Sequence, residues 1–167
     1  MSAPFRVEPL AAEHDRVAFS CGEPALDVYF RTQVTQDVRR HITNCFIAID
    51  VATEIVAGFY TLSAASIPVR GLPPGLTKRL PRYPVLPAVR IGRLAVATQF
   101  RGRKLGAALL ADAAERALGA APASFTLLVD AKNDVAVAFY EHHGFVRLAS
   151  QPQSLFLPLA TIAKAKR

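Results

Sequence analysis

The chain has 167 residues, of which 51% are hydrophobic and 20% are charged, and its formal net charge is +7. This length and composition exclude a disordered chain and leave room for one packed core, so we expect a single domain spanning residues 1–167. No apolar run is long enough for a membrane span and no basic leader precedes one, which predicts a cytoplasmic protein without membrane contact. Cys21 and Cys45 lack a CxxC or metal-ligand spacing, so neither a disulfide framework nor a metal site is expected.

The N-terminal part predicts a short strand followed by an amphipathic helix. Residues 5–9 alternate in polarity as a strand does, and the Gly-Glu-Pro run at 22–24 opens a helix with proline in its first turn. Apolar residues then recur at every fourth position, at Leu26, Phe30, Val34 and Val38. We expect that face to be core and the charged residues of the segment, Asp27 among them, to face water.

A hairpin and a long connection follow. Segments 43–50 and 55–67 are rich in β-branched and aromatic residues and meet at the run 52–54, which predicts an antiparallel pair. The prolines of segment 68–87 exclude a central strand or a regular helix there. Connections of this length are usually functional or mobile. Its basic residues leave two interpretations open: a solvated linker, or a loop that grips a substrate.

The C-terminal half predicts alternating strands and helices. Strands are expected over 88–96, 125–130, 145–149 and 155–159, and helices over 102–118 and 134–143. In the first of these helices one apolar stripe contains Leu105, Leu109, Ala113 and Ala117. Strands outnumber helices, so the predicted fold class is a layered α/β domain with helices on both faces of a mixed, largely antiparallel sheet.

The stretch RIGRLAVATQFRGRKLGAAL, residues 90–109, joins an apolar strand to a helix through small and basic residues. A helix start leaves several backbone N–H groups unpaired and directs the positive end of the helix dipole outward. Gly102 and Gly106 let a bulky anion approach, and Arg101, Arg103 and Lys104 add positive charge. The junction therefore predicts a phosphate site, although it matches neither the Walker nor the GxGxxG pattern.

Two motifs carry a family resemblance. RLAVATQFRGRKLGAALLADAAERAL resembles the acetyl-CoA-binding motif of the GNAT acetyltransferase superfamily, in which an R/Q-x-x-G-x-G/A loop wraps the cofactor pyrophosphate. NDVAVAFYEHHGF, residues 133–145, resembles the segment that follows it in that family. Lys104 stands where the motif has its first glycine. The stretches LPRYPVLPAVRIGRLAV and FSCGEPALDVYF are similar to the GNAT toxins of bacterial toxin–antitoxin modules.

This resemblance implies a function and partners. A toxin of that group transfers acetyl from acetyl-CoA to the α-amine of aminoacyl-tRNA and so blocks translation. It is neutralised by a ribbon-helix-helix antitoxin, and a homodimer is expected. An acetyltransferase of a small-molecule amine or a protein N-terminus stays open as an alternative function, as does a binding module without catalysis.

The resemblance also assigns roles to residues. The cofactor would be held by Leu94, Ala95, Val96, Arg101, Gly102, Arg103, Lys104, Leu105, Gly106, Ala107, Asn133 and Phe139. A backbone N–H of Leu94 or Val96 would donate to the thioester oxygen. Tyr140 would protonate the departing thiolate. The residues themselves leave simpler interpretations open: a core strand at 94–96, a helix cap at Asn133 and a half-buried aromatic at Tyr140.

The attacking amine sets the need for a base. A free α-amine titrates near 7.7–8.0 and an ester neighbour lowers its pKa further, so positioning alone would suffice. His142 and His143 are expected at the surface and are assigned no role. For RNA contact we expect a basic set that gives salt-dependent affinity, consisting of Arg70, Lys78, Arg79, Arg82, Arg90 and Arg93. Arg90 and Arg93 should point to opposite faces of their strand.

Overall fold

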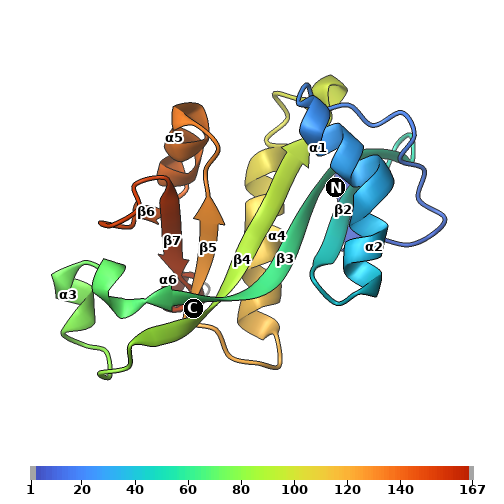
Figure 1. Ribbon diagram of the computed structural model, residues 1–167. Coiled ribbons are helices and arrows are strands. Elements are labelled where there is room, and N and C mark those ends of the chain that lie inside the picture. The colour runs from blue at the N-terminus through green and yellow to red at the C-terminus, as the bar shows by residue number, and fades with distance from the viewer. Residues whose placement is uncertain (1–2, 166–167) are drawn as a thin grey trace. The chain divides into compact units, whose positions relative to one another are not determined.

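The computed structural model describes residues 3–165, and their packing groups the chain into two compact units (Figure 1). Unit 1 contains the described residues up to 63 together with 92–113, and unit 2 contains 64–91 and those from 114 onward. Strands β3 and β4 and helix α4 each contribute to both units. None of the helices in this part of the chain has the length and apolarity that a membrane crossing requires.

The strands form a sheet in the order β1-β2-β3-β4-β5-β7-β6. The pairs β1–β2, β2–β3, β5–β7 and β6–β7 are antiparallel, whereas β4 and β5 are parallel. The predicted mixed, largely antiparallel sheet is confirmed. The strands are β1 (Phe5–Pro9), β2 (Asn44–Asp50), β3 (Ile55–Pro68), β4 (Val85–Val96), β5 (Thr126–Asp130), β6 (Val146–Arg147) and β7 (Ser154–Pro158).

In unit 1, strand β3 has helices packed on both of its faces. Phe30 stacks on Phe59 with ring centroids 4.1 Å apart, so the N-terminal helix covers that face. Adjacent strand residues point to opposite faces, and a Cβ on neighbouring Gly58 would lie 3.2 Å from Leu109 of α4 (Leu105–Gly119). The expected apolar stripe of α4 is buried throughout its length, at Leu105, Leu109, Ala113 and Ala117.

The N-terminal helix differs from its prediction in two ways. It is divided into α1 (Pro24–Val28), a π-helical turn η1 (Tyr29–Gln33) and α2 (Val34–Arg39). The prediction that Asp27 faces water is wrong. Asp27 is only 6% exposed, and its carboxylate accepts a 2.8 Å hydrogen bond from the Cys21 N–H. A buried N–H needs an acceptor, and Asp27 supplies it.

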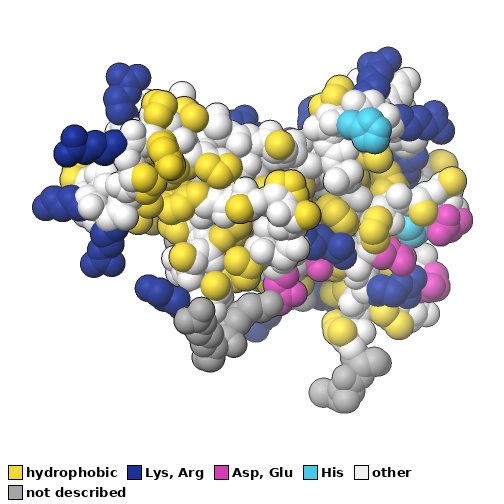
Figure 2. Space-filling model, turned by 90° about the horizontal axis from the view of Figure 1, so that it is seen from below, with side chains coloured by type: hydrophobic (Ala, Val, Ile, Leu, Met, Phe, Trp, Pro, Cys, Tyr) yellow, Lys and Arg dark blue, Asp and Glu magenta, His cyan; other side chains and the backbone are white. Residues whose placement is uncertain are grey.

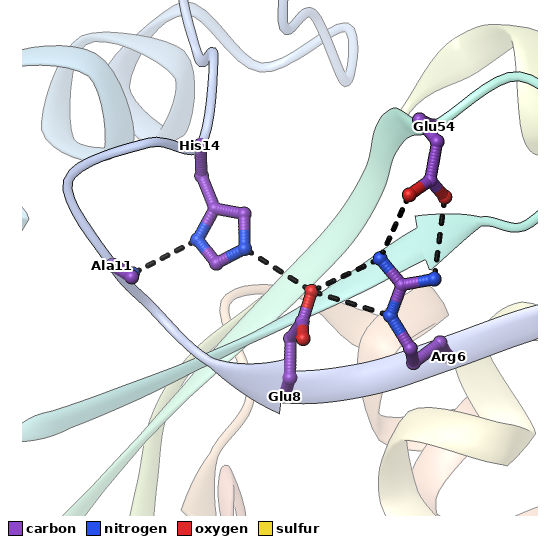
Figure 3. A network of polar contacts seen from close by, with 5 residues as sticks. All are labelled: Arg6, Glu8, Ala11, His14 and Glu54. Carbon is purple, nitrogen blue, oxygen red and sulfur yellow. Dashed lines mark hydrogen bonds and ion pairs between the residues drawn. The ribbon is translucent and has the colours of Figure 1, made fainter.

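A polar network on unit 1 joins β1 to two loops (Figure 3). Arg6 donates to both carboxylate oxygens of Glu54, at 3.1 and 3.2 Å, and also to Glu8. His14 lies 3.1 Å from Glu8 through Nε2, while its Nδ1 accepts from the Ala11 N–H at 2.9 Å. That acceptor role fixes the tautomer, so His14 donates its only ring hydrogen to Glu8. The network holds the 10–14 loop and the 51–54 turn against β1.

The Pro-rich segment of unit 2 is folded onto a core. Leu72 is 4% exposed and packs with Ile67, Leu86 and Phe156. The segment forms a 3-10 turn η2 (Val69–Gly71) and a one-turn helix α3 (Pro74–Thr77). Strand β4 begins at Val85 and includes Pro87, so the expectation that these prolines exclude a strand was wrong at this end. Pro87 lies before the ladder to β5, which starts at Ala88, so its missing N–H costs no bond there.

The remaining elements of unit 2 confirm the predicted order. Helix α5 (Asp134–His142) and strands β5, β6 and β7 occur where the sequence predicts them, within a few residues. No sequence pattern predicted the C-terminal helix, α6 (Leu159–Ala165). Its buried Leu159 donates its N–H to the Phe125 carbonyl at 2.9 Å, which ties the helix start to the beginning of β5.

Gly58→Ala tests the close approach of β3 and β4. The added Cβ would lie 2.9 Å from the Ala95 carbonyl oxygen, and backbone cannot swing aside as a side chain can. We expect a loss of about 1–3 kcal/mol in the free energy of unfolding, measured by urea titration. Gly75→Ala is the control, because nothing lies within 4 Å of a Cβ there. Equal stability of the two variants would contradict the interpretation.

Candidate active site

Helix α4 starts later than its sequence predicts, and this leaves its first amides unbonded within the helix. It begins at Leu105, and its earliest bond runs from the Ala108 N–H to the Lys104 carbonyl at 3.2 Å. The N–H groups of Leu105, Gly106 and Ala107 therefore precede that bond and point out of the helix start. Together with the helix dipole they favour an anion at this end.

The turn before α4 is left-handed at two residues. Gly102 has φ 77° and Lys104 has φ 61°. No atom lies within 4 Å of a Cβ built on Gly102, so the space beside that turn is open. Lys104 adopts a backbone conformation that costs a residue with a Cβ roughly 1–2 kcal/mol. This explains why glycine suits the position in the motif that the sequence resembles.

The basic side chains of this turn have different contacts. Arg101 donates to the Cys21 carbonyl oxygen, and Arg103 lies over the rings of Phe5 and Phe100, with centroid distances of 4.8 and 5.6 Å. Within residues 3–165, Lys104 is exposed and its ammonium has no hydrogen-bond or ion-pair partner. The sequence placed all these cations around one phosphate, whereas the structure uses both arginines to anchor the turn and leaves Lys104 available.

The strand segment 94–96 lies beyond the parallel ladder. The register of β4 with β5 covers Ala88 to Ile91, and β4 then continues to Val96. Ala95 is buried, and Leu94 and Val96 are half-buried. The Ala97 N–H donates to the Ala57 carbonyl at 2.8 Å, which fixes the end of the strand on β3.

Tyr140 lies on α5, in unit 2, and is only 8% exposed. Its ring contacts Phe139 and Phe145 edge-on, with centroids 5.2 and 5.4 Å apart. Burial raises the pKa of Tyr140 to about 12, so the phenol keeps its proton at neutral pH. Every fully buried side-chain oxygen of the described residues has a hydrogen-bond partner. The Tyr140 hydroxyl has no hydrogen bond to any described residue, so it is not one of those fully buried oxygens. The phenol oxygen thus reaches the surface, where it can donate to a ligand.

The neighbours of Tyr140 on α5 have structural contacts. Asn133 caps the helix by accepting from the Ala136 N–H at 2.9 Å, and half-buried Phe139 packs on His143. Glu141 forms a 3.2 Å ion pair with Arg147. Burial, reinforced by neighbouring His142, lowers the pKa of His143. The capping role that the sequence allowed for Asn133 is therefore present in the structure.

The six basic residues assigned to RNA divide into two kinds. Arg70, Lys78, Arg79 and Arg82 belong to the Pro-rich segment, are exposed and have no ion-pair partner within the described chain. Figure 2 shows Lys and Arg side chains gathered on the side of the molecule that carries α3. Arg90 instead forms a 3.0 Å ion pair with Asp130, and Arg93 lies over the Tyr29 ring at 3.6 Å.

A cavity of about 290 Å³ lies within unit 1. It is lined by Phe19 and Ser20, by the turn at Glu54 and by Thr98 and Gln99. None of the predicted site residues lines it, and its lining contains no motif that could have revealed it in the sequence. The pairing of Tyr29 with Arg93 was also missed, since a contact between a helix and a distant strand leaves no local pattern. Asp27 had a local signal, because it shares helical spacing with Phe30 and Val34.

The chain is similar to known proteins over most of its length. Residues 42–147 match the family model described as an acetyltransferase (GNAT) domain. A probable toxin TacT of Sinorhizobium fredii is 30% identical over 93% of this chain and 92% of its own. A tRNA-acetylating toxin of Mycobacterium tuberculosis is 35% identical over 93% of this chain and 91% of its own.

Solved structures show the same fold. AtaT complexed with acetyl-methionyl-tRNAfMet is 30% identical and has a TM-score of 0.88, with 98% of this chain and 99% of that chain covered. A Tyr-to-Phe variant of AtaT, bound to acetyl-CoA and the C-terminus of its antitoxin AtaR, is 27% identical, with a TM-score of 0.81 and coverage of 98% and 99%. These likenesses confirm the fold class predicted from the sequence.

Lys104→Gly tests the left-handed turn. Glycine adopts φ 61° without strain, so we expect the free energy of unfolding to rise by about 0.5–1 kcal/mol despite glycine's larger entropy loss. Thermal and urea unfolding measure the change. Lys78→Gly is the matched control, because that exposed lysine has φ −58° and glycine should only destabilise there. A loss of stability at both positions would show that the turn relaxes in solution.

Proposed function

This chain belongs to the GNAT acetyltransferase family, and on that premise we propose that it is a toxin that transfers acetyl from acetyl-CoA to the α-amine of aminoacyl-tRNA. The observation that carries the proposal is similarity along almost the whole chain to proteins described by this activity, including 35% identity to a tRNA-acetylating toxin. Modification of that amine removes the nucleophile of peptide-bond formation, so translation stops. Acetyl-CoA is the co-substrate.

The start of α4 fits the diphosphate of coenzyme A. The outward N–H groups of Leu105, Gly106 and Ala107 are donors for phosphate oxygens, and the open space beside Gly102 admits a bulky group. In this proposal Lys104 supplies the free cation, whereas Arg101 and Arg103 hold the turn in shape. The Lys104→Gly variant should then lose about tenfold in coenzyme A affinity although it gains stability.

Acetyl-CoA supplies its acetyl group as a thioester. The chain's own residues act on the carbonyl oxygen and on the sulfur of that thioester. We assign the backbone of Leu94, Ala95 and Val96 to the pantetheine arm, since β4 continues there beyond its ladder with β5. An N–H of Leu94 or Val96 donates to the carbonyl oxygen as negative charge develops on it. Asn133 and Phe139 are assigned to the cofactor as well, Asn133 through the turn that it caps.

Tyr140 acts on the leaving group. The amine nitrogen bonds to the acetyl carbon, the carbon–sulfur bond breaks, and Tyr140 gives its proton to the sulfur. A phenol with a pKa near 12 is fully protonated before the step, as this role requires. The amine of an aminoacyl ester is largely neutral at cellular pH, so water can accept its proton and no dedicated base is needed.

The exposed cations of the Pro-rich segment are assigned to RNA phosphates. Arg70, Lys78, Arg79 and Arg82 are not neutralised by carboxylates in the described chain, and the net charge of +7 reinforces their attraction to a polyanion. Arg90 is a weaker candidate because Asp130 already accepts its hydrogen bond. Arg93 is assigned to the RNA as well.

The partners follow from the relatives. AtaT has been solved with tRNA and with the C-terminus of its antitoxin, and KacT with its antitoxin and DNA. For this chain we propose a ribbon-helix-helix antitoxin, a homodimer and action in the cytoplasm, where charged tRNA is found. We further propose that residues 1–167 work as one acetyltransferase domain.

Tyr140→Phe tests the reaction and the acid together. Purified protein is mixed with labelled acetyl-CoA and charged tRNA, and acetyl transfer to the aminoacyl group is followed by hydrolysis and chromatography. We expect kcat to fall about 100-fold or more in the variant, with unchanged coenzyme A binding. Tyr83→Phe is the matched control, since that tyrosine is 61% exposed and has no assigned role. Failure of the wild-type protein to label any aminoacyl-tRNA would refute the function, and full activity of Tyr140→Phe would refute the acid.

The pH profile tests the state of the phenol. The rate should rise as the amine loses its proton and level off near pH 8. It should not fall by pH 10.5, because a phenol with a pKa of about 12 is still protonated there. A phenol with its ordinary pKa of about 10 would be roughly three-quarters ionised at that pH, and the rate would drop about fourfold. An amide-linked analogue of the aminoacyl RNA avoids ester hydrolysis during the measurement.

A further inference from the structure

Arg93 is held flat against a buried aromatic ring. Its guanidinium carbon lies 3.6 Å from the centroid of the Tyr29 ring, and both residues belong to unit 1. Tyr29 is only 4% exposed, and its hydroxyl donates to Asp37 at 2.8 Å, which fixes the ring in its plane. The Arg93 N–H donates to the hydroxyl of buried Thr61 at 3.0 Å, so the backbone that carries the side chain is fixed as well.

The short separation determines how the guanidinium is oriented. If the edge of the guanidinium faced the ring, the nitrogens bonded to its central carbon would be closer to the ring carbons than the sum of their van der Waals radii. The planar group must therefore lie nearly parallel to the ring. Its inner face covers Tyr29, and because Arg93 is exposed, its outer face meets solvent. The side chain is a rigid planar cation with one free face.

Arg93 differs from the other arginines of the sheet. Arg6, Arg90 and Arg147 each face a carboxylate, Glu54, Asp130 and Glu141 respectively. Among the described residues Arg93 has no carboxylate partner within ion-pair distance. Its charge is not taken up by an ion pair and its orientation is fixed by the Tyr29 ring, and a ligand can use both properties.

We propose that the outer face of Arg93 is a platform on which a nucleobase of the RNA substrate stacks, namely the base at the 3′ end that carries the amino acid. The proposal rests on the function proposed above. Unpaired bases at RNA ends stack on aromatic rings and on arginine planes, and the free guanidinium face offers such a surface. A phosphate contact alone would need charge but not a fixed plane.

The position of Arg93 along β4 supports this occupant. It directly precedes Leu94, where the assigned pantetheine segment begins. A strand advances about 3.3 Å per residue, so the platform and Val96 are roughly 10 Å apart along β4. That spacing is comparable to the distance from a terminal base to the amine of the amino acid esterified to its ribose. A base stacked on Arg93 would bring that amine toward the thioester.

The experiment uses an RNA hairpin with an acceptor-stem sequence and the fluorescent base 2-aminopurine at its 3′ terminus. Wild-type protein is expected to change the fluorescence on binding, because stacking alters the emission of this base. Arg93→Lys keeps the charge but removes the plane, so it should bind the RNA within about threefold of wild type and lose most of the fluorescence change. The kcat/KM for the aminoacylated hairpin should fall about tenfold.

Arg6→Lys is the matched control, since it makes the same substitution in unit 1 at an arginine that is paired with Glu54 and has no assigned role. It should leave the fluorescence change intact. An unchanged fluorescence signal in Arg93→Lys would overturn the platform. The platform would also be overturned if Arg93→Lys lost as much affinity for a hairpin that lacks the terminal nucleotide as for the complete hairpin, because such a loss would indicate a phosphate contact. If wild-type protein acetylates charged tRNA but the fluorescence change is the same in Arg93→Lys, only the platform is refuted. If it neither binds RNA nor acetylates it, the proposed function fails too.

Discussion

The candidate site depends on the unpaired amides at the start of α4. A helix cannot bond its own first N–H groups, and here the left-handed turn at Gly102 and Lys104 releases the chain so that these donors point outward. The rest of unit 1 keeps that helix in place. Leu105 and Leu109 are buried against β3, where Gly58 allows the close approach. The proposed cofactor site thus depends on a main-chain constraint that few side chains could replace.

The basic residues of the chain divide into those that support the structure and those left for ligands. Arg101 and Arg103 bind a carbonyl and two aromatic rings, and Arg90 binds a carboxylate. Lys104 and the cations of the Pro-rich segment have no such partner among the described residues. A net charge of +7 therefore overstates the charge that is free to act, and the location of the unneutralised groups carries more information than their number.

Burial tunes Tyr140, the one acid of the proposed mechanism. The hydrophobic neighbours Phe139 and Phe145 leave Tyr140 poorly solvated, and the loss of water penalises the phenolate. A tyrosine in this setting donates a proton or hydrogen bond but does not act as a base. The same principle applies to Cys45, whose pKa burial raises to about 12, so that this thiol stays protonated and unreactive.

The sequence by itself determined the order of the strands and of helices α4 and α5, the apolar stripe of α4 and the family, because periodicity and local motifs depend only on nearby residues. It also identified Lys104 as the departure from the motif, although only the structure showed its positive φ. Tertiary structure alone decided which cations are free and that Arg93 lies on Tyr29. Each of these depends on residues distant in sequence that meet only when the strands and helices pack, and no local pattern encodes such a meeting.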